Sequence, residues 1–352
     1  MSLSQLVQKE KGRACLTLRL NRPEALNTLN REMVLQLHQA LTQAERDEQC
    51  AFVVICGAGE RGFCAGGDIK AMASDVREGR RDQVLEFLEQ EYALDLFIHE
   101  MTTPVVVLAQ GVCMGGGLGL AAGADLVVAD ETTRMSMPES RIGFFPDVGA
   151  TGWLFRKCPP GYPEFLGLTG FELRGAECVR TGLATHCVPG GSLMVLREEL
   201  ESLNPGDLPQ DSGRLRGVLQ GIIESRSVDD RSRKPVMDEW VSSHFCGAQS
   251  VVRIRESLKT CSVEHDLCRF VFSEFAARSP TSLVLTLHLL RRNQGRDMAE
   301  VYRSDLQAAS FMLGHPDFLE GVRARLLDKD NQPRWDPGSL EDVDLSWVFA
   351  GS

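Results

Sequence analysis

Apolar and polar positions alternate with a period of two near the start of the chain. The apolar members of this pattern are Ala14, Leu16, Leu18 and Leu20. Side chains at every second residue of a strand lie on one face, so the pattern predicts a half-buried strand. Asn21 and Pro23 end the alternation, and the strand is expected to end there.

A helical stripe and a continuous apolar run come next. The stripe follows Asn30, a residue type that caps helix N-termini. Its apolar members are Met33, Val34, Leu37, Leu41 and Ala44. Residues 51–56 are almost entirely apolar, as in a strand buried on both faces, and they lead into the glycine-rich loop 57–67. Strand, helix, strand and glycine loop in this order indicate an α/β protein.

The same period arguments predict the remaining elements. Helices are expected over 82–101 and 118–122, strands over 105–108, 125–130 and 185–188, an extended piece over 135–138, and helices between 151 and 187 that end at glycines. The polar segments 204–213 and 225–234 are predicted to be linkers. Leucines at 283, 287 and 290 are typical of the helical pattern farther on. We therefore expect an α/β core over 1–190 and a mainly helical region over 191–352.

Composition excludes several functions. The 352 residues are 43% apolar without an apolar run of membrane-spanning length, so a globular chain that does not enter a membrane is expected. The net charge of −11 argues against non-specific binding to nucleic acid or to an anionic membrane. Eleven cysteines without CxxC or metal-like spacing predict reduced thiols in an intracellular compartment and no metal site. Residues 1–13 lack the features of a signal or transit peptide, so a leader is either not encoded or has been trimmed.

The stretch 111–150 combines a glycine run with two carboxylates. Gly115, Gly116 and Gly117 lie between a predicted strand and a predicted helix, where backbone N–H groups can face an anion. Glu139 and Asp147 follow in the same stretch, and a carboxylate near such donors can act as base or nucleophile in acyl chemistry. Taken without the carboxylates, the glycines would indicate only close packing of a helix on a sheet.

Two further features bear on a site. Residues 63–70, FCAGGDIK, are a second place where backbone N–H groups can face a ligand. Glu91 lies in the long predicted helix, and we expect a solvated charge there unless the helix borders a pocket.

Several segments together resemble the crotonase (enoyl-CoA hydratase/isomerase) superfamily. The matching segments are NRPEALN (21–27), GFCAGGDI (62–69), MGGG (114–117) and MPE (137–139). Within the superfamily the chain resembles the 3-hydroxyisobutyryl-CoA hydrolases. That resemblance rests on FPDVG (145–149), LTG (168–170), ATH (184–186), EGVRA (320–324), DKD (328–330) and Trp335. The segments keep their order and spacing over nearly the whole chain.

The resemblance implies a fold and a set of site residues. The fold would be a spiral of ββα units whose terminal helices cover the site and mediate homo-oligomers. The N–H groups of Gly67 and Gly116 would form an oxyanion hole, and Glu91, Gly116, Glu139 and Asp147 would contact the substrate. The predicted coenzyme A contacts are Ala25, Leu26, Asp68 and Ile69, with Arg22, Lys70 and Lys329 as phosphate partners or, equally, solvated surface charges. No metal and no cofactor other than the coenzyme A of the substrate is expected.

Two departures from the superfamily pattern decide between reactions. Hydratases of the superfamily use a second glutamate at the position that is Gly119 here, so a hydration mechanism with two carboxylates is not expected. Asp147 stands where hydratases have a small residue, which is the mark of the hydrolase branch. The resemblance thus implies hydrolysis of a short hydroxyacyl-CoA, 3-hydroxyisobutyryl-CoA in valine catabolism, in the mitochondrion or alternatively the cytoplasm. A hydratase or isomerase, or an inactive binding protein with this fold, is the alternative.

Overall fold

A computed structural model describes residues 5–228, 234–261, 263–346 and 348 of the chain. These residues divide into two compact units that alternate along the chain. The first unit comprises the described residues within Met1–Gly67, Gln90–Met135 and Glu172–Ser232, and the second those within Asp68–Glu89, Ser136–Phe171 and Arg233–Ser352. Sequence predicted a single boundary near residue 190 instead. Beyond that residue the described chain is helical, as predicted.

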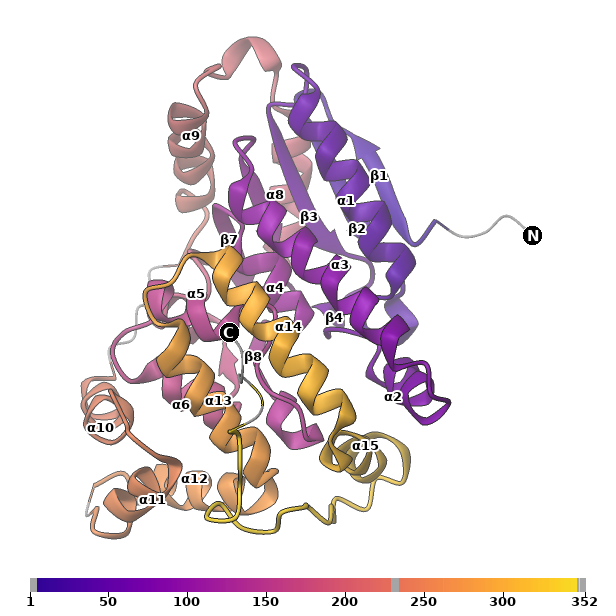
Figure 1. The fold of residues 1–352 in the computed structure, drawn as a ribbon. Helices are drawn as coiled ribbons and strands as arrows, with labels where there is room; N and C mark the ends of the chain where they lie inside the picture. The colour runs from indigo at the N-terminus through magenta and orange to yellow at the C-terminus, as the bar shows by residue number, and fades with distance from the viewer. Residues whose placement is uncertain (1–4, 229–233, 262, 347, 349–352) are drawn as a thin grey trace. The chain divides into compact units, whose positions relative to one another are not determined.

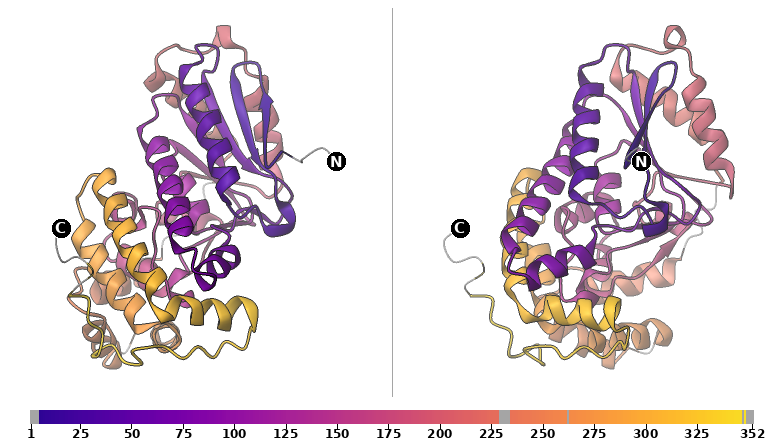
Figure 2. Two further views of the ribbon diagram at one scale, coloured as in Figure 1. Left: turned by 45° about the vertical axis from the view of Figure 1, so that its right-hand side comes forward. Right: turned by 90° about the vertical axis from the view of Figure 1, so that its right-hand side faces the viewer.

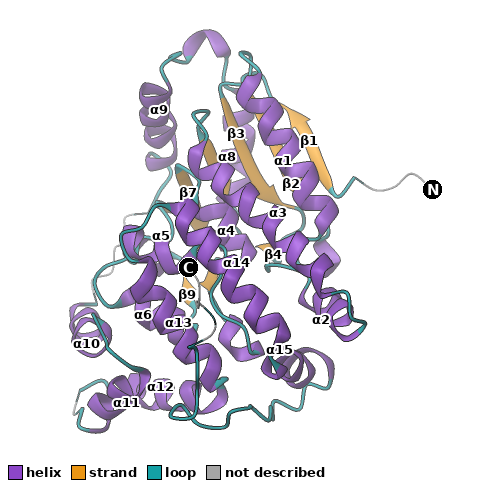
Figure 3. Ribbon diagram, viewed as in Figure 1, coloured by secondary structure: helices purple, strands orange, loops and turns teal. Residues whose placement is uncertain are grey.

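The strands of the described chain are short and mostly lie in the first half of the sequence (Figure 3). They are β1(Val7–Lys11), β2(Cys15–Leu20), β3(Phe52–Gly57), β4(Gly62–Cys64), β5(Val105–Leu108), β6(Val112–Met114), β7(Leu126–Asp130), β8(Arg134–Ser136), β9(Leu173–Arg174) and β10(His186–Val188).

The helices of the first unit cover its sheets or lie at their edges. They are η1(Pro23–Ala25), α1(Arg31–Arg46), the second half of α3(Arg81–Glu100), α4(Gly116–Ala122), α7(Ala176–Arg180), α8(Ser192–Ser202), η3(Pro205–Asp207) and α9(Ser212–Glu224).

The second unit is built from helices. They are α2(Ile69–Arg77), the first half of α3, η2(Glu139–Ile142), α5(Ala150–Lys157), α6(Tyr162–Thr169), α10(Pro235–Phe245), α11(Val251–Lys259), α12(His265–Ala277), α13(Pro280–Asn293), α14(Met298–Gly314), α15(Pro316–Val322) and the π-helical turn η4(Arg323–Leu327). Helix α13 packs against α5, α6 and α14, and α15 packs against α2 and η2. Phe165 of α6 lies in an aromatic cluster with Tyr162, Trp240 and Phe245.

The strands repeat in pairs along the chain, each pair followed by helix. The first members β3, β5 and β7 are neighbours in the six-stranded sheet β1-β2-β3-β5-β7-β10, where they pair in parallel. The second members β4, β6 and β8 form the four-stranded sheet β4-β6-β8-β9. This is the repeated ββα arrangement that the resemblance predicts, and that prediction is confirmed.

Helices bury both faces of the six-stranded sheet within the first unit. Figure 1 shows α1 in front of β2 and β3, with α8 behind them and α9 farther back at the left. In the right-hand view of Figure 2 the sheet lies between α1 and the helices α8 and α9. One face alternates through Phe52, Val54 and Cys56 of β3 and packs on the leucines of α8 and α9. Because both faces are covered, all six residues of β3 are buried, as predicted from the continuous apolar run.

Local signals explain where several elements begin, and some elements escaped prediction. The Asn30 side chain accepts a hydrogen bond from Met33 N at 2.9 Å, which caps α1 as expected. The loop 57–67 was wrongly predicted to be irregular throughout, since it contains β4. The edge strand β1 was also missed, because VQKEK is too polar to give an apolar alternation.

Three further expectations concern the cysteines, membrane-spanning helices and a linker. No cysteine forms a disulfide in the described part of the chain, in agreement with reduced thiols. None of the described helices is both long enough and apolar enough to cross a membrane. Of the predicted linker over 225–234, residues 229–233 lie outside the described residues.

Candidate active site

The two predicted oxyanion glycines follow the ends of neighbouring parallel strands in the first unit. Strand β4 pairs in parallel with β6, and Gly67 lies three residues beyond the first and Gly116 two residues beyond the second. Because parallel strands end at the same edge of a sheet, both turns meet there. A Cβ atom on Gly66 would lie 3.2 Å from Met114 O and 3.3 Å from Gly116 N, so the two turns are in contact.

The amides of these glycines have no acceptor in the described chain. Neither Gly67 N nor Gly116 N donates a hydrogen bond to any described residue. Gly116 is buried at the start of α4, where an N–H group has no partner inside the helix. Gly67 is half-buried. A buried N–H group without an acceptor is costly, so the Gly116 amide in particular suits a ligand oxygen.

Glu91 lies against Gly116. A Cβ atom at position 116 would overlap Glu91 Oε1 and lie 3.3 Å from Leu29 Cδ1, so glycine is required for this close approach. Glu91 is only 2% exposed, and the expectation of a solvated helix charge is therefore wrong. The reason is that this turn of α3 packs against the glycine run rather than facing water. The structure brings Glu91 and Gly116 together, and their role as substrate contacts stays a prediction.

The Cys64 thiol, three residues before Gly67, is not a nucleophile. Burial, with smaller contributions from the charges of Glu91 and Asp95, raises the pKa of Cys64 to about 12. A thiol with such a pKa carries almost no thiolate at neutral pH. The attacking group therefore has to come from another residue or from water.

The loop that carries Ala25 and Leu26 is fixed beside the Gly67 turn. Asn27 Nδ2 donates to Ala58 O at 3.0 Å and to Gly62 O at 2.9 Å, and its Oδ1 accepts from Arg22 N. Ala65 N donates to Leu26 O at 3.0 Å. Ala25 and Leu26 are half-buried at this joint, and their contact with coenzyme A stays a prediction.

Arg22 has partners within the same loop. Its Nη1 donates to Thr28 O at 2.7 Å and to Thr28 Oγ1 at 3.3 Å. The guanidinium thus shapes the loop, and its role as a phosphate partner stays a prediction.

Glu139 begins the short helix η2 in the second unit. It is 8% exposed and shares this turn with Ser140, whose Oγ accepts from Arg278 Nη1 at 2.8 Å. Burial lowers the pKa of Arg278 to about 9, and the negative charges of Glu274 and, more weakly, Glu139 oppose this fall. Arg278 is therefore cationic at neutral pH and acts electrostatically on Glu139.

Asp147 lies in a tight turn that starts α5. It is 7% exposed, and its backbone oxygen accepts from Ala150 N at 2.9 Å. Val148 has φ of 49°, a left-handed conformation that β-branched residues rarely adopt. Trp153 Nε1 holds this turn by donating to Val148 O at 2.9 Å. Backbone strain of this kind gathers at functional sites, where the surroundings have to hold it in place.

The remaining predicted residues lie in the second unit, apart from Gly119. The Asp68 side chain caps α2 by accepting from Ala71 N at 3.4 Å, and Ile69 begins that helix. Lys70 is exposed on α2, and Lys329 is exposed after η4, as expected of surface charges. Gly119 is buried inside α4, and no carboxylate comes from that position. The coenzyme A roles of Asp68, Ile69, Lys70 and Lys329 stay predictions.

Two buried side chains were missed by sequence. Arg278 precedes a helix start and carries no recognisable pattern. Asp305 does carry a signal, because it falls four residues after Val301 and four before Ala309 on the buried stripe of α14. A charged residue inside an apolar helical stripe indicates a specific buried partner.

Known proteins resemble this chain along nearly its full length. The family described as enoyl-CoA hydratase/isomerase matches residues 15–350. The mitochondrial 3-hydroxyisobutyryl-CoA hydrolase of Gallus gallus is 34% identical over 97% of this chain and 87% of that protein. The small ribosomal subunit protein mS47 of Schizosaccharomyces pombe is 32% identical over 94% of this chain and 76% of that protein.

A solved structure agrees with these relatives. An enoyl-CoA hydratase from Rhodobacter sphaeroides 2.4.1 has a TM-score of 0.85 and 32% identity, over 97% of this chain and 96% of that one. Family, curated relative and fold point the same way as the motifs. The chain therefore belongs to the enoyl-CoA hydratase/isomerase (crotonase) superfamily, and within it is similar to the 3-hydroxyisobutyryl-CoA hydrolases.

Proposed function

We propose that the chain hydrolyses (S)-3-hydroxyisobutyryl-CoA to 3-hydroxyisobutyrate and coenzyme A, a step of valine catabolism. The chain is an acyl-CoA thioester hydrolase. The observation that carries the proposal is the pair of acceptor-free amides, Gly67 and Gly116, beside the buried carboxylate of Glu91. The hydrolase name of a relative that is 34% identical supports the same reaction.

In the proposed mechanism the two amides bind the thioester oxygen. They donate to this oxygen as it gains negative charge, which lowers the barrier to attack on the carbonyl carbon. Glu139 either attacks that carbon itself or removes a proton from an attacking water. In the first route a mixed anhydride forms, coenzyme A leaves as a thiolate, and water then cleaves the anhydride. In the second route water adds directly and the thiolate leaves from the tetrahedral intermediate.

Glu91 and Asp147 are assigned to recognition of the acyl group. A buried carboxylate can accept a hydrogen bond from a substrate hydroxyl group, and a site built around that bond disfavours substrates without the hydroxyl. Both residues are at most 7% exposed, so either carboxylate would bind such a hydroxyl away from bulk water. This supports a hydroxyacyl substrate over a plain acyl chain. Asp147 would also orient the attacking water.

Hydration of an enoyl-CoA is the competing reaction within the superfamily. It requires an acid and a base on one face of a double bond. The position of the second glutamate is Gly119, which has no side chain to offer. We therefore propose that crotonyl-CoA is hydrated negligibly.

The test is a thiol-release assay with purified protein. (S)-3-hydroxyisobutyryl-CoA is expected to give free coenzyme A, detected with a colorimetric thiol reagent. Crotonyl-CoA serves as the matched substrate, and loss of its enoyl absorbance reports hydration. Rapid loss of enoyl absorbance without thiol release would overturn the proposal in favour of a hydratase.

A binding function is the second candidate. One relative, 32% identical, is named a small ribosomal subunit protein, so a chain of this family can serve in an assembly. The same assay separates the two. Absence of thiol release from a panel of short acyl-CoA thioesters, with coenzyme A binding retained, would favour the binding function.

The proposal also covers the ligands of the protein, its location in the cell and its oligomeric state. Coenzyme A enters as part of the substrate through the predicted contacts, and we propose no metal or other cofactor. Relatives named mitochondrial support a mitochondrial location, which immunolocalisation of the untagged protein tests. Assembly into homo-oligomers is a further expectation, which light scattering of the purified protein tests.

A further inference from the structure

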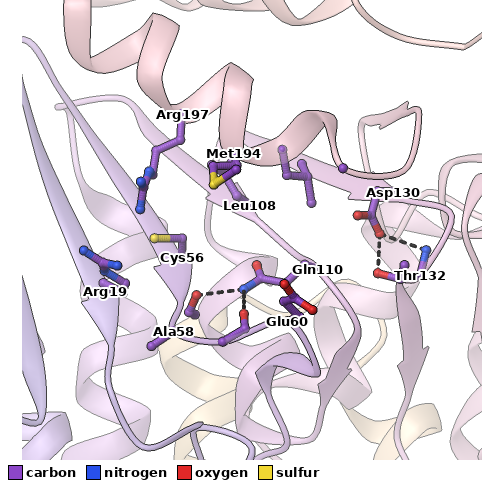
Figure 4. A pocket seen from close by; sticks show the side chains of 14 residues that line it. Arg19, Cys56, Ala58, Glu60, Leu108, Gln110, Asp130, Thr132, Met194 and Arg197 are labelled. Atoms are coloured by element: carbon purple, nitrogen blue, oxygen red, sulfur yellow. Dashed lines mark hydrogen bonds between the residues drawn. The ribbon is translucent and has the colours of Figure 1, made fainter.

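A cavity of about 500 Å³ lies within the first unit, at the carboxyl ends of β3, β5 and β7. Its wall continues over the first turns of α8, as Figure 4 shows. None of the residues assigned above to acyl-CoA lines it. Parallel α/β sheets bind ligands at this end of their strands, and small-molecule pockets have volumes of roughly 300–1,000 Å³.

Two arginines from different elements converge on one end of the cavity. Arg19 comes from β2 and Arg197 from α8, and in Figure 4 both side chains point toward Cys56. Burial raises the pKa of Cys56, while the charges of Arg197 and Arg19 oppose this rise. Both guanidinium groups are thus within electrostatic range of one point, where the Glu201 carboxylate is the opposing charge.

The carboxylates that now pair with these two arginines would compete only weakly with a bound anion. Arg19 pairs with Glu10, and Arg197 Nε lies 3.6 Å from Glu201 Oε1. The four side chains are 20–36% exposed, and solvent screening leaves such pairs worth little. The Nε atoms of both arginines are buried and form no hydrogen bond within the described part of the chain. A guanidinium group has five N–H donors, more than one carboxylate partner uses, so a bound anion can share each arginine with its present partner.

Apolar side chains line the middle of the cavity. Leu108 and Leu193 are buried, whereas Met194 is 63% exposed. A flexible thioether at this position can cover a ligand of varied shape. The middle of the cavity therefore suits a short hydrocarbon segment.

The polar groups across from the arginines are already satisfied. Asp130 Oδ1 accepts from Thr132 N at 2.9 Å and from its Oγ1 at 2.6 Å. Gln110 Nε2 donates to Gly57 O at 2.7 Å. Figure 4 places Asp130 on the opposite side of the cavity from the arginines. Glu60, the other carboxylate of the lining, lies beside Gln110 and away from the arginines in Figure 4, so the arginines set the charge at their own end of the cavity.

We propose that this cavity is a second ligand site, which binds a small carboxylate with a short apolar body. The carboxylate lies between Arg19 and Arg197, and the apolar body lies along Leu108 and Met194. Guanidinium groups bind carboxylates through paired, charge-assisted hydrogen bonds, which a neutral head group cannot replace.

The test is calorimetric titration of the full-length protein with hexanoate. Hexan-1-ol supplies the apolar body without the charge, and inorganic phosphate supplies the charge without the body. Hexanoate is expected to bind saturably, whereas hexan-1-ol and inorganic phosphate are not. Substitution of Arg197→Gln or Arg19→Gln should weaken it at least about tenfold, or about 1.4 kcal/mol. Either variant serves if the other fails to fold.

Matched controls make the outcome decisive. Arg226 pairs with Glu199 of α8 outside the cavity. Arg226→Gln therefore removes an arginine that also pairs with a glutamate of α8, and it should leave the affinity for hexanoate unchanged. Saturating coenzyme A should also leave the affinity for hexanoate unchanged. Absence of saturable hexanoate binding, equal binding of hexan-1-ol, or displacement of hexanoate by coenzyme A would overturn the proposal.

Discussion

Asp305 Oδ2 accepts a hydrogen bond from the backbone N–H of Gly149 at 2.8 Å, in a place where the carboxyl group is fully buried. Its Oδ1 accepts from Thr151 Oγ1 at 3.4 Å, which in turn accepts from Asn293 Nδ2 at 2.8 Å. These contacts tie α14 and α13 to the turn that carries Asp147. Asp305 therefore holds the turn that carries Asp147, and we expect it to act on Asp147 through that turn.

Two replacements of Asp305 should separate the effect of its hydrogen bond to Gly149 from the effect of filling space in the core. Asp305→Leu leaves the Gly149 N–H without its acceptor, which costs about 1–3 kcal/mol in the free energy of unfolding. Turnover should fall as well, because the Asp147 turn loses its support. Asp305→Asn keeps an acceptor for Gly149 and should restore most of both quantities. Urea unfolding and thiol release check this, and equal activity of the two variants would contradict the positioning role.

Asp305 also makes stability depend on pH. Burial raises the pKa of Asp305 well above its ordinary value, the hydrogen bond from Gly149 opposes this rise, and the charge of Asp147 adds to it. A raised carboxyl pKa stabilises the fold below the unfolded-state pKa of about 3.9, and the contribution is lost as the pH rises through the folded-state pKa. The stability advantage of wild type over Asp305→Asn should thus shrink with rising pH. A pH-independent difference in urea midpoints would contradict this.

Enlargement of Gly116 should damage catalysis more than stability. A side chain there displaces the Glu91 carboxylate and blocks approach of a thioester to the amide. Loss of one oxyanion donor raises the barrier by about 2.7–4 kcal/mol, and Gly116→Val should lose at least that much. Gly221→Ala is the matched control, since a Cβ there meets nothing within 4 Å in α9. Normal kcat/KM for Gly116→Val would remove this amide from the site.

Replacement of Glu139 by glutamine should abolish its role as base or nucleophile while keeping its shape. Turnover should fall by about 10²–10⁴-fold if Glu139 is a general base, and further if it attacks the thioester. Thermal unfolding should change little in comparison. A folded Glu139→Gln protein with near-normal thiol release would exclude Glu139 from the chemistry.

The parts of the fold that sequence predicted are those with a local cause. Helix α1 and strands β2, β3 and β5 follow from periodicity, from a cap or from an uninterrupted apolar run. Strand β4 has only three residues and exists because it pairs with β6, about fifty residues away in the chain. No local pattern contains that information.

The residues of the candidate site likewise divide into those with a local sequence signal and those without one. Gly67, Gly116, Glu139 and Asp147 stand in recognisable motifs, and resemblance alone assigned their roles. The burial of Glu91 depends on packing against a glycine run that lies in another segment, so its sequence neighbourhood indicated a solvated charge instead. Asp305 was missed although it interrupts an apolar stripe, because its partner Gly149 is distant in sequence.

Asp147→Asn is the most specific test of the reaction. The substitution keeps the size of the side chain and the left-handed turn at Val148, but it removes the negative charge. We expect Asp147 to orient the attacking water or the substrate hydroxyl as a charged acceptor. Hydrogen bonds to charged groups contribute about 1.5–3 kcal/mol. Thiol release from (S)-3-hydroxyisobutyryl-CoA should therefore fall by about tenfold or more in Asp147→Asn. The loss should be smaller for isobutyryl-CoA, because that substrate lacks the hydroxyl group and makes no such bond. Equal losses for the two substrates would assign Asp147 to the water. Unchanged hydrolysis of both would leave the hydrolase mechanism without Asp147.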